Sequence, residues 1–182
     1  MAEINSNDYH DYVIKNGKLI GEFEQMYCKS QDVPWHQDEQ VNWLDVKLTI
    51  ELLREYGPFS FISDFGSGYG YFLDKIARNC GTGNPVLHGY DISKTACKKG
   101  GTIFSNIIFH QFDLMADHME SGWAEQNRAL FVLRGTLWYV YPKINNVVRN
   151  ISLMVNKQDY FLVSQNSPPP FFFKFCRKRC YS

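Results

Sequence analysis

The sequence predicts an α/β fold, with a mainly parallel sheet and helices on both faces. Short apolar runs suited to strands alternate with segments of helical apolar period over most of the 182 residues. One of these runs, at residues 61–63, leads directly into a glycine-rich turn and then into a helix-like segment. Acidic residues close three successive runs, at Asp64, Asp91 and Asp113. These observations favour parallel strands joined by right-handed helical connections.

The composition is that of one globular domain. Hydrophobic residues make up 45% of the chain and aromatic residues 16%, which is enough to bury a core. The formal net charge is zero, but the last fifteen residues hold four basic residues and no acid, so the rest is mildly acidic. An acidic body suits a phosphate backbone poorly. We therefore expect a small-molecule partner and no nucleic acid.

The cysteines and the polar N-terminus indicate a cytoplasmic protein. Five cysteines lack the spacing of a metal site, so we expect reduced thiols and no bound metal. The first residues contain no apolar core of a signal peptide, and no run reaches membrane-spanning length. Cys180 is third from the end, so a prenylation signal is absent. We expect no membrane contact.

The segment before the first strand is expected to contain a short helix and a turn. Phe23, Met26 and Tyr27 have the spacing of one helix face, beginning near residue 21. Pro34 then favours a turn. Trp35 beside it is either a plug over the core or part of a ligand lid.

The remaining elements follow from apolar period and from glycine and proline positions. Residues 38–56 are expected to form a helix ended by a Gly-Pro pair. Its apolar stripe is expected to contain Val41, Leu44, Leu48 and Leu52, joined by Trp43, Ile50 and Leu53. Further helices are expected at residues 71–80, 93–99 and 144–155. The strands are expected at residues 59–64, 86–90, 103 or 106 to 112, 129–133 and 160–163.

The turn after the first strand carries glycines at positions 66, 68 and 70. Glycine suits this turn because it needs positive φ angles and because a ligand must approach bare backbone. The first N–H groups of the next helix then face the turn. A dinucleotide fingerprint would need its third glycine where Tyr71 stands, and the Gly-Lys-Ser/Thr end of a phosphate loop is missing. An ordinary connection that binds nothing is the remaining alternative.

The pattern D-x-G-x-G-x-G from Asp64 to Gly70 resembles motif I of the class I S-adenosylmethionine-dependent methyltransferases. A carboxylate before the first glycine suits a cofactor with sulfonium and ammonium charges, and would repel a pyrophosphate. The resemblance covers roughly residues 12–166. It implies a Rossmann-like methyltransferase fold, S-adenosylmethionine as cofactor, and methyl transfer to a small-molecule acceptor by in-line displacement.

The acids at the strand ends extend the resemblance, because ligands of open α/β sheets bind at the carboxyl ends of the strands. Asp91 lies twenty-one residues past Gly70, where an acid can accept hydrogen bonds from both ribose hydroxyls. Asp113 resembles the family position that accepts from the adenine amino group. Each acid alone could instead cap a helix, but three together favour a cofactor site. The expected cofactor contacts are Asp64, Gly66, Ser67, Gly68, Gly70, Asp91, Ile92, Phe112, Asp113 and Leu133.

Residues 129–141 resemble the family's fourth strand and the loop that faces the methyl donor. Many family members carry an acid or asparagine near Arg134. The arginine could hold an anionic substrate as a planar fork, or it could pair with a nearby acid at the surface. Trp35, Arg134 and Trp138 are the candidate substrate contacts, although the aromatic residues could also belong to the core.

An oxygen or nitrogen acceptor can need a general base. His36 and Tyr139 are the candidate catalytic residues for this role. A lone histidine is more often structural than catalytic, so each requires a test. Little covalent help is expected, because positioning and exclusion of water supply much of the rate of a methyl transfer.

Residues 167–182 look unlike a continuation of a sheet. Three prolines precede three phenylalanines and a basic end that contains cysteine. Class I methyltransferases usually continue past strand five into a hairpin that supplies strands six and seven. We therefore expect those strands to be missing and the reading frame to be lost near Ser167, which leaves strand five as an apolar edge open to self-association. A membrane contact is the alternative use of this tail.

The chain is accordingly divided into three parts. Residues 1–40 are a lid or cap, residues 41–166 the S-adenosylmethionine-binding methyltransferase domain, and residues 167–182 an irregular tail. Two other functions remain open. One is a non-catalytic S-adenosylmethionine-binding fragment, which has lost the parts that close over substrate. The other is an NAD-dependent oxidoreductase, which the missing third glycine disfavours.

Overall fold

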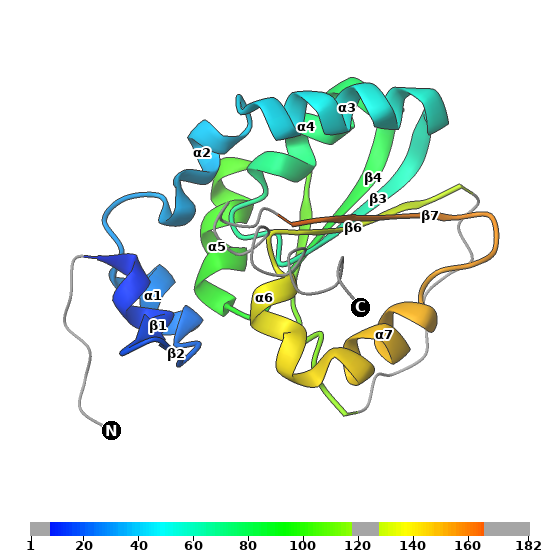
Figure 1. Ribbon diagram of the computed structural model, residues 1–182. Coiled ribbons are helices and arrows are strands. Elements are labelled where there is room, and N and C mark those ends of the chain that lie inside the picture. The colour runs from blue at the N-terminus through cyan, green and yellow to red at the C-terminus, as the bar shows by residue number, and fades with distance from the viewer. Residues whose placement is uncertain (1–7, 118–127, 166–182) are drawn as a thin grey trace, which may run out of the picture.

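The computed structural model describes residues 8–117 and 128–165. At its centre is a five-stranded sheet in the order β5-β4-β3-β6-β7, in which every neighbouring pair is parallel (Figure 1). The parallel α/β class is confirmed, and β6 and β7 are the fourth and fifth strands expected from the sequence. The strands are β3 (Phe59–Phe65), β4 (Gly81–Asp91), β5 (Ile108–Gln111), β6 (Leu130–Arg134) and β7 (Tyr160–Ser164).

The chain starts this sheet in the middle and fills its two sides in turn. From β3 it moves outward through β4 to β5, and then crosses to β6 and β7 on the other side of β3. The direction in which strands are added therefore reverses between β3 and β6. The connections that leave the carboxyl ends of these two strands run to opposite sides of the sheet. Such a switch point is where open α/β sheets bind ligands.

Helices cover both faces of the sheet (Figure 1). Helices α3 (Leu44–Tyr56) and α4 (Tyr71–Cys80) pack on one face, and α6 (Leu137–Val140) and α7 (Ile144–Ser152) on the other. Helix α5 (Lys94–Ile103) lies along β4 and β5. Successive strand residues point to opposite faces, so Ile62 enters the core under α3 and α4, and Phe61 enters the core under α7.

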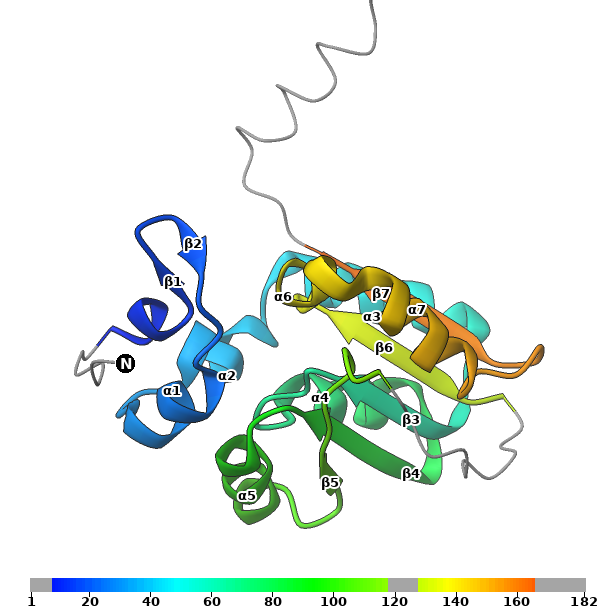
Figure 2. The ribbon, with the colours of Figure 1, turned by 90° about the horizontal axis from the view of Figure 1, so that it is seen from below.

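The N-terminal elements pack beside the sheet, next to α5, and not on either face (Figure 2). They share an apolar cluster with Tyr69 of the glycine turn and Ala96 of α5. A hairpin turned at Asn16-Gly17 was not predicted, although Asn-Gly is a strong hairpin signal. The elements are η1 (Tyr9–Tyr12), β1 (Ile14–Lys15), β2 (Lys18–Leu19), α1 (Phe23–Lys29), η2 (Pro34–His36) and α2 (Gln37–Gln40), and a short η3 (Tyr141–Lys143) joins α6 to α7.

The helix predicted over residues 38–56 ends before Gly57 as expected, but it is broken between α2 and α3. Its buried side chains are Ile50 and Leu53, which were expected in the apolar set, and Val46, which was not. The predicted stripe faces outward, with Leu44 70% and Leu48 61% exposed. The helix has two apolar stripes, and periodicity alone does not say which of them meets the sheet.

Three further boundaries differ from the prediction. Strand β4 begins at Gly81, five residues early, by pairing with Phe59 of β3. Helix α5 continues through Gly100 to Ile103, and β5 is correspondingly short. Gly100 is required within the helix because a Cβ there would meet the ring of Phe109 at 2.6 Å. Gly100, which was expected to follow the helix, instead lies within it and allows close packing of the helix on the sheet.

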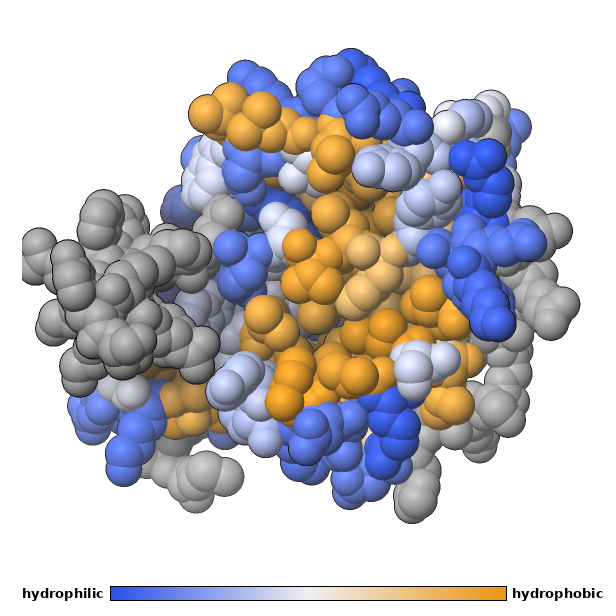
Figure 3. All heavy atoms as spheres, turned by 45° about the vertical axis from the view of Figure 1, so that its right-hand side comes forward, coloured by the Kyte–Doolittle hydropathy of each residue, from blue (hydrophilic) through white to orange (hydrophobic). Residues whose placement is uncertain are grey.

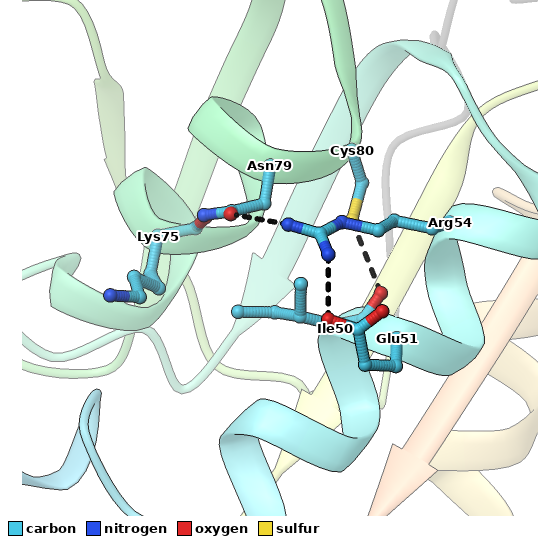
Figure 4. A network of polar contacts seen from close by, with 6 residues as sticks. All are labelled: Ile50, Glu51, Arg54, Lys75, Asn79 and Cys80. Atoms are coloured by element: carbon cyan, nitrogen blue, oxygen red, sulfur yellow. Dashed lines mark hydrogen bonds and ion pairs between the residues drawn. The ribbon is translucent and has the colours of Figure 1, made fainter.

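Polar contacts join the ends of α3 and α4 (Figure 4). Arg54 donates to Glu51 on its own helix at 2.6 Å and to Asn79 Oδ1 on α4 at 3.1 Å. The Cys80 thiol donates to the carbonyl of Ile50 at 3.7 Å. The exposed ion pair adds little stability. The Arg54–Asn79 and Cys80–Ile50 contacts join α3 to α4, the helix that begins at the glycine turn.

Apolar side chains gather on the face that carries the sheet's β7 edge (Figure 3). Within the described residues, no strand pairs with the outer side of β7, and no sixth or seventh strand joins the sheet. The predictions about residues 167–182 lie outside the described residues. Exposed apolar residues on the neighbouring elements are Leu44, Leu48 and Leu52 of α3, Val148 of α7, and Phe161 and Val163 of β7.

None of the helices in residues 8–117 and 128–165 combines the length and the apolar character needed to cross a bilayer. In the same ranges the cysteines Cys28, Cys80 and Cys97 are free thiols.

Candidate active site

A cavity of about 190 Å³ lies at the carboxyl ends of β3, β4, β5 and β6. Its lining includes residues at or next to these strand ends, among them Asp64, Asp91 and Arg134. Residues from the N-terminal elements close it from the other side. The cavity thus occupies the switch point at which the strand order reverses.

The glycine turn has the backbone that the sequence predicted. Gly66, Gly68 and Gly70 have φ angles of 78°, 55° and 90°. The N–H groups of Gly66 and Ser67 both donate to the carbonyl of Tyr90, at 2.7 and 3.0 Å, so the turn is closed against the end of β4. A Cβ on Gly66 would collide with the side chain of Thr136. Glycine is therefore required there for space as well as for conformation.

Asp91 ties this turn to the following helix. Its buried carboxylate accepts from Gly68 N–H through Oδ2 and from Ser93 N–H through Oδ1, both at 2.9 Å. Burial raises the pKa of Asp91 to about 6, although both backbone donors oppose the rise. A carboxylate has four acceptor sites, so two remain for a ligand. Ile92, which follows it, is partly exposed and lines the cavity.

Asp64 is the most deeply buried acid of the cavity. Burial raises its pKa to about 8; the Arg134 guanidinium opposes the rise, and the Asp91 carboxylate adds to it. At neutral pH the protonated form of Asp64 is therefore favoured. A cationic ligand group beside Asp64 would favour its ionised form, so ligand charge and Asp64 ionisation are coupled.

Asp113 caps a turn and also lines the cavity. Its Oδ1 accepts from Met115 N–H at 2.8 Å, a turn-capping contact. The side chain also lines the cavity together with Phe112. The capping contact uses one of the two carboxylate oxygens, so it does not exclude ligand binding through the other.

Arg134 lies at the end of β6, and both of its terminal nitrogens donate a hydrogen bond. It donates to Gln40 Oε1 at 3.0 Å and to Asp45 Oδ2 at 2.7 Å, and its guanidinium lies 4.8 Å from the centre of the Phe72 ring. Its Nε is buried and has no partner within the described residues. Arg134 is thus paired with an acid, but inside the cavity wall, where its side chain is 12% exposed.

Aromatic rings form the opposite wall of the cavity. Trp35 lies 6.0 Å from Tyr27, 6.3 Å from Phe23 and 5.9 Å from Tyr139, between ring centres. All four side chains line the cavity. Trp35 is therefore both part of an aromatic cluster and part of the cavity wall.

Gln37 joins this wall to the glycine turn. Its Oε1 accepts from Tyr69 N–H at 2.9 Å, and its Nε2 donates to the Tyr27 hydroxyl at 3.1 Å. The side chain fills the space that a Cβ on Gly68 would need. One amide group thus contacts both sides of the cavity.

Several predicted site residues lie elsewhere. His36 is exposed and lines a separate hollow with Asp8 and His10. Trp138 is 49% exposed and does not line the cavity, and Leu133 is buried in the core under α7. Of the two candidate bases, the structure brings only Tyr139 to the cavity. Burial raises the pKa of the Tyr139 phenol, so it is a hydrogen-bond donor at neutral pH.

Sequence reasoning missed other lining residues. Gln37 and Gln40 stand in a polar segment with no periodic signal, and their role depends on where that segment docks. Thr136 was within reach of prediction, because it follows the fourth strand at its carboxyl end. Its hydroxyl donates to the carbonyl of Phe65 at 3.2 Å and so links the ends of β6 and β3. In the described part of the chain, no group of three or more His, Cys, Asp or Glu could hold a metal ion.

Comparison with known proteins gives structural matches alone. No protein-family model matches the chain, and no curated protein matches it. The N-methyltransferase NodS from Bradyrhizobium japonicum WM9, solved with S-adenosyl-L-homocysteine, matches with a TM-score of 0.54 and 17% identity. The match covers 76% of this chain and 71% of that one.

Two other solved structures agree. The plantazolicin methyltransferase BpumL, in complex with a pentazolic desmethylPZN analog and SAH, gives a TM-score of 0.53 at 16% identity over 78% of this chain. Human N-acetylserotonin methyltransferase, in complex with SAM, gives 0.52 at 15% identity, also over 78%. These matches span only 56% and 36% of those two proteins. The chain spans about half the length of two further matched proteins. These are a SAM-dependent methyltransferase from Geobacter sulfurreducens, of which 47% is covered, and YcgJ from Bacillus subtilis, of which 56% is covered. The chain has the Rossmann-like fold of the class I S-adenosylmethionine-dependent methyltransferases.

Proposed function

We propose that this chain binds S-adenosylmethionine at the carboxyl ends of β3, β4 and β5, and transfers a methyl group to a small-molecule acceptor by in-line displacement. One observation carries the proposal. Asp91 holds the glycine turn through the N–H of Gly68, in a cavity that Asp64 and Asp113 also line. This arrangement joins the three predicted acids to the predicted turn at one place.

The residues present fit the cofactor. Asp91 has acceptor sites left for two ribose hydroxyls, and Ile92 and Phe112 provide apolar contacts for adenine. Asp113 would accept from the adenine amino group. The cavity-lining residues Ser67 and Arg134 each hold a buried polar atom, Oγ and Nε, without a partner in the described residues. Buried polar atoms of this kind are expected where a ligand completes their hydrogen bonds.

Bound S-adenosylmethionine supplies a methyl group on a positively charged sulfur, which leaves as a neutral thioether. The chain contributes position and exclusion of water. Trp35 and Phe23 shield the cavity from the lid side. The Tyr139 phenol can orient an acceptor by donating a hydrogen bond, whereas His36 lies outside the cavity. The lid role of residues 1–40 is part of this proposal.

Self-association through β7 and a cytoplasmic location stay predictions. The first is supported by the exposed Phe161 and Val163 on an edge strand. The second is supported by the cysteine pattern of the sequence.

Titration calorimetry of S-adenosylmethionine into the full chain tests the proposal, with NAD as the control ligand. We expect binding of S-adenosylmethionine alone. Asp91→Ala should weaken it about 100-fold or more, since two hydrogen bonds to a carboxylate are lost. Asp38→Ala, which removes an exposed carboxylate outside the cavity, should not change the affinity. Binding of NAD alone, or unchanged affinity in a folded Asp91→Ala variant, would contradict the proposal.

Transfer of labelled methyl groups to a pool of metabolites then separates an enzyme from a non-catalytic binding protein. Label in a small-molecule product is expected. Cofactor binding without any labelled product would favour the non-catalytic alternative.

A further inference from the structure

The aromatic wall brings together rings from three separate elements. Phe23 and Tyr27 come from α1, Trp35 from η2 and Tyr139 from α6. The Phe23 and Tyr139 rings lie 5.3 Å apart between centres, and Trp35 contacts both. A cation within about 6 Å of one ring centre is attracted to that ring, and close spacing places neighbouring rings within reach as well.

The charged groups of the cavity have the opposite sign to a cation. Its lining contains the acids Asp91 and Asp113, the acid Asp64, whose raised pKa favours the protonated form at neutral pH, and one guanidinium, from Arg134. That guanidinium is neutralised by its ion pair with Asp45 at 2.7 Å. An anionic acceptor would therefore meet net repulsion, whereas a positive group would be attracted.

Backbone strain indicates that the wall is held in place. Trp35 has φ 55° and ψ 16°, and the next residue, His36, has φ 50°. Left-handed backbone is unfavourable in a residue other than glycine. Gln40 opposes this cost by donating from Nε2 to the Trp35 carbonyl at 2.6 Å. Strain of this kind gathers at ligand clamps.

We propose that the acceptor is an alkylamine whose nitrogen lies against the aromatic wall formed by Phe23, Tyr27, Trp35 and Tyr139. The inference rests on the proposed function and names its substrate class. The alkylammonium ion first loses a proton to bulk water, and the nitrogen then reacts as the neutral amine. Its lone pair forms the N–C bond, the electron pair of the broken C–S bond stays on sulfur, and the positive charge passes to nitrogen. A wall that stabilises positive charge suits this product, whereas an oxygen acceptor ends neutral after proton loss.

A pair of probes of equal shape tests the wall. Choline carries a quaternary ammonium group, and 3,3-dimethylbutan-1-ol replaces that nitrogen by carbon. Both are titrated into the full chain saturated with S-adenosyl-L-homocysteine, and binding is followed by NMR. We expect choline to bind at least about fivefold more tightly, as cation–π attraction in a partly desolvated site predicts. Equal affinities, or tighter binding of the alcohol, would overturn the inference.

Variants show whether the rings are responsible. Trp35→Leu and Tyr139→Leu should each lower the ratio of choline to alcohol affinity about threefold, whereas Tyr139→Phe should preserve it. Trp43→Leu is the matched control, because Trp43 is 46% exposed and lies outside the cavity lining. The ratio compares two probes on one sample, so a partly unfolded fraction cancels. An unchanged ratio in both leucine variants would assign cation binding to the carboxylates and overturn the inference.

Competition distinguishes acceptor from cofactor. Choline bound to the free protein and then displaced by S-adenosyl-L-homocysteine would show that the wall belongs to the cofactor's own site, which would also overturn the inference. Failure of S-adenosyl-L-homocysteine to bind contradicts the proposed function by itself. The probe ratio on the free protein then still decides whether the wall prefers a cation.

Discussion

The two sides of the cavity are built by different means. The strand-end side consists of the glycine turn and Asp91, and backbone hydrogen bonds hold it together. The lid side consists of aromatic rings and glutamine side chains that reach the cavity from α1, η2 and α2. The first side follows from a local motif placed on a sheet. The second exists only because a separate segment docks in one position.

Polar contacts at the start of α5 establish that docking. The Glu24 carboxylate accepts from the Ser93 and Thr95 hydroxyls, both at 2.6 Å, and from Thr95 N–H at 3.1 Å. Lys99 donates to the Tyr27 carbonyl at 2.6 Å. Gln37 adds the contact with the glycine turn. The lid side should therefore tolerate the loss of one contact better than the strand-end side does.

Gly66→Ala should disrupt the strand-end side most. A Cβ there adds left-handed strain at φ 78° to a collision with Thr136, so the free energy of unfolding should fall by about 3 kcal/mol. Urea unfolding measures this, and calorimetry should show S-adenosylmethionine binding lost. Gly17→Ala is the matched control, with φ 73° and open space around its Cβ. Equal losses in both variants would refute a collision in the turn.

Asp64→Asn should change how stability depends on pH. The folded-state pKa of Asp64 is raised to about 8, from 3.8, so its stabilising contribution is complete below pH 3.8 and is lost as pH rises through 8. The variant lacks this loss and should be more stable than the native protein by about 2 kcal/mol at pH 8. Urea unfolding at several pH values measures the difference, which should shrink toward pH 4. A difference independent of pH would contradict the raised pKa.

Gln37→Ala should weaken the link between the two sides. It removes the acceptor of Tyr69 N–H and the donor to the Tyr27 hydroxyl, so unfolding free energy should fall by about 1.5 kcal/mol. Amide hydrogen exchange at Tyr69 should become faster. Gln37→Glu keeps an acceptor for that N–H and should protect it better. Unchanged exchange in Gln37→Ala would mean that the lid docks without this contact.

Glu24→Gln should have the smallest effect. Burial would raise the pKa of Glu24, but hydrogen bonds from Ser93, Thr95 and Cys28 outweigh it and lower the pKa to about 2. Its stabilisation is therefore present above pH 4.5 and is lost as pH falls through 2. Because the side chain is exposed, we expect about 0.5 kcal/mol at pH 7 from thermal unfolding, and less at pH 3. A larger difference at pH 3 than at pH 7 would contradict this sign.

The order of elements and the strand-end side of the site could be predicted from local signals. Apolar runs mark strands, glycines mark a turn with positive φ, and acids that close successive parallel strands must lie at one edge of the sheet. Asp64, Asp91 and Asp113 line one cavity for this reason. Leu133 was misplaced because side chains alternate between faces, and its own face points into the core.

The lid side depends on contacts between residues far apart in the chain. Nothing near Gln37 indicates that its amide reaches Tyr69, and nothing near Arg134 indicates that Asp45 pairs with it. The face that α3 buries also depends on distant contacts, because the helix has two apolar stripes and only one of them packs on the sheet. His36 and Trp35 are neighbours, yet one side chain lies in a separate hollow and the other in the cavity wall. Spacing along the chain specifies which face of an element is apolar, whereas packing in three dimensions specifies which neighbour that face meets, because the free energy of burial depends on the partner surface.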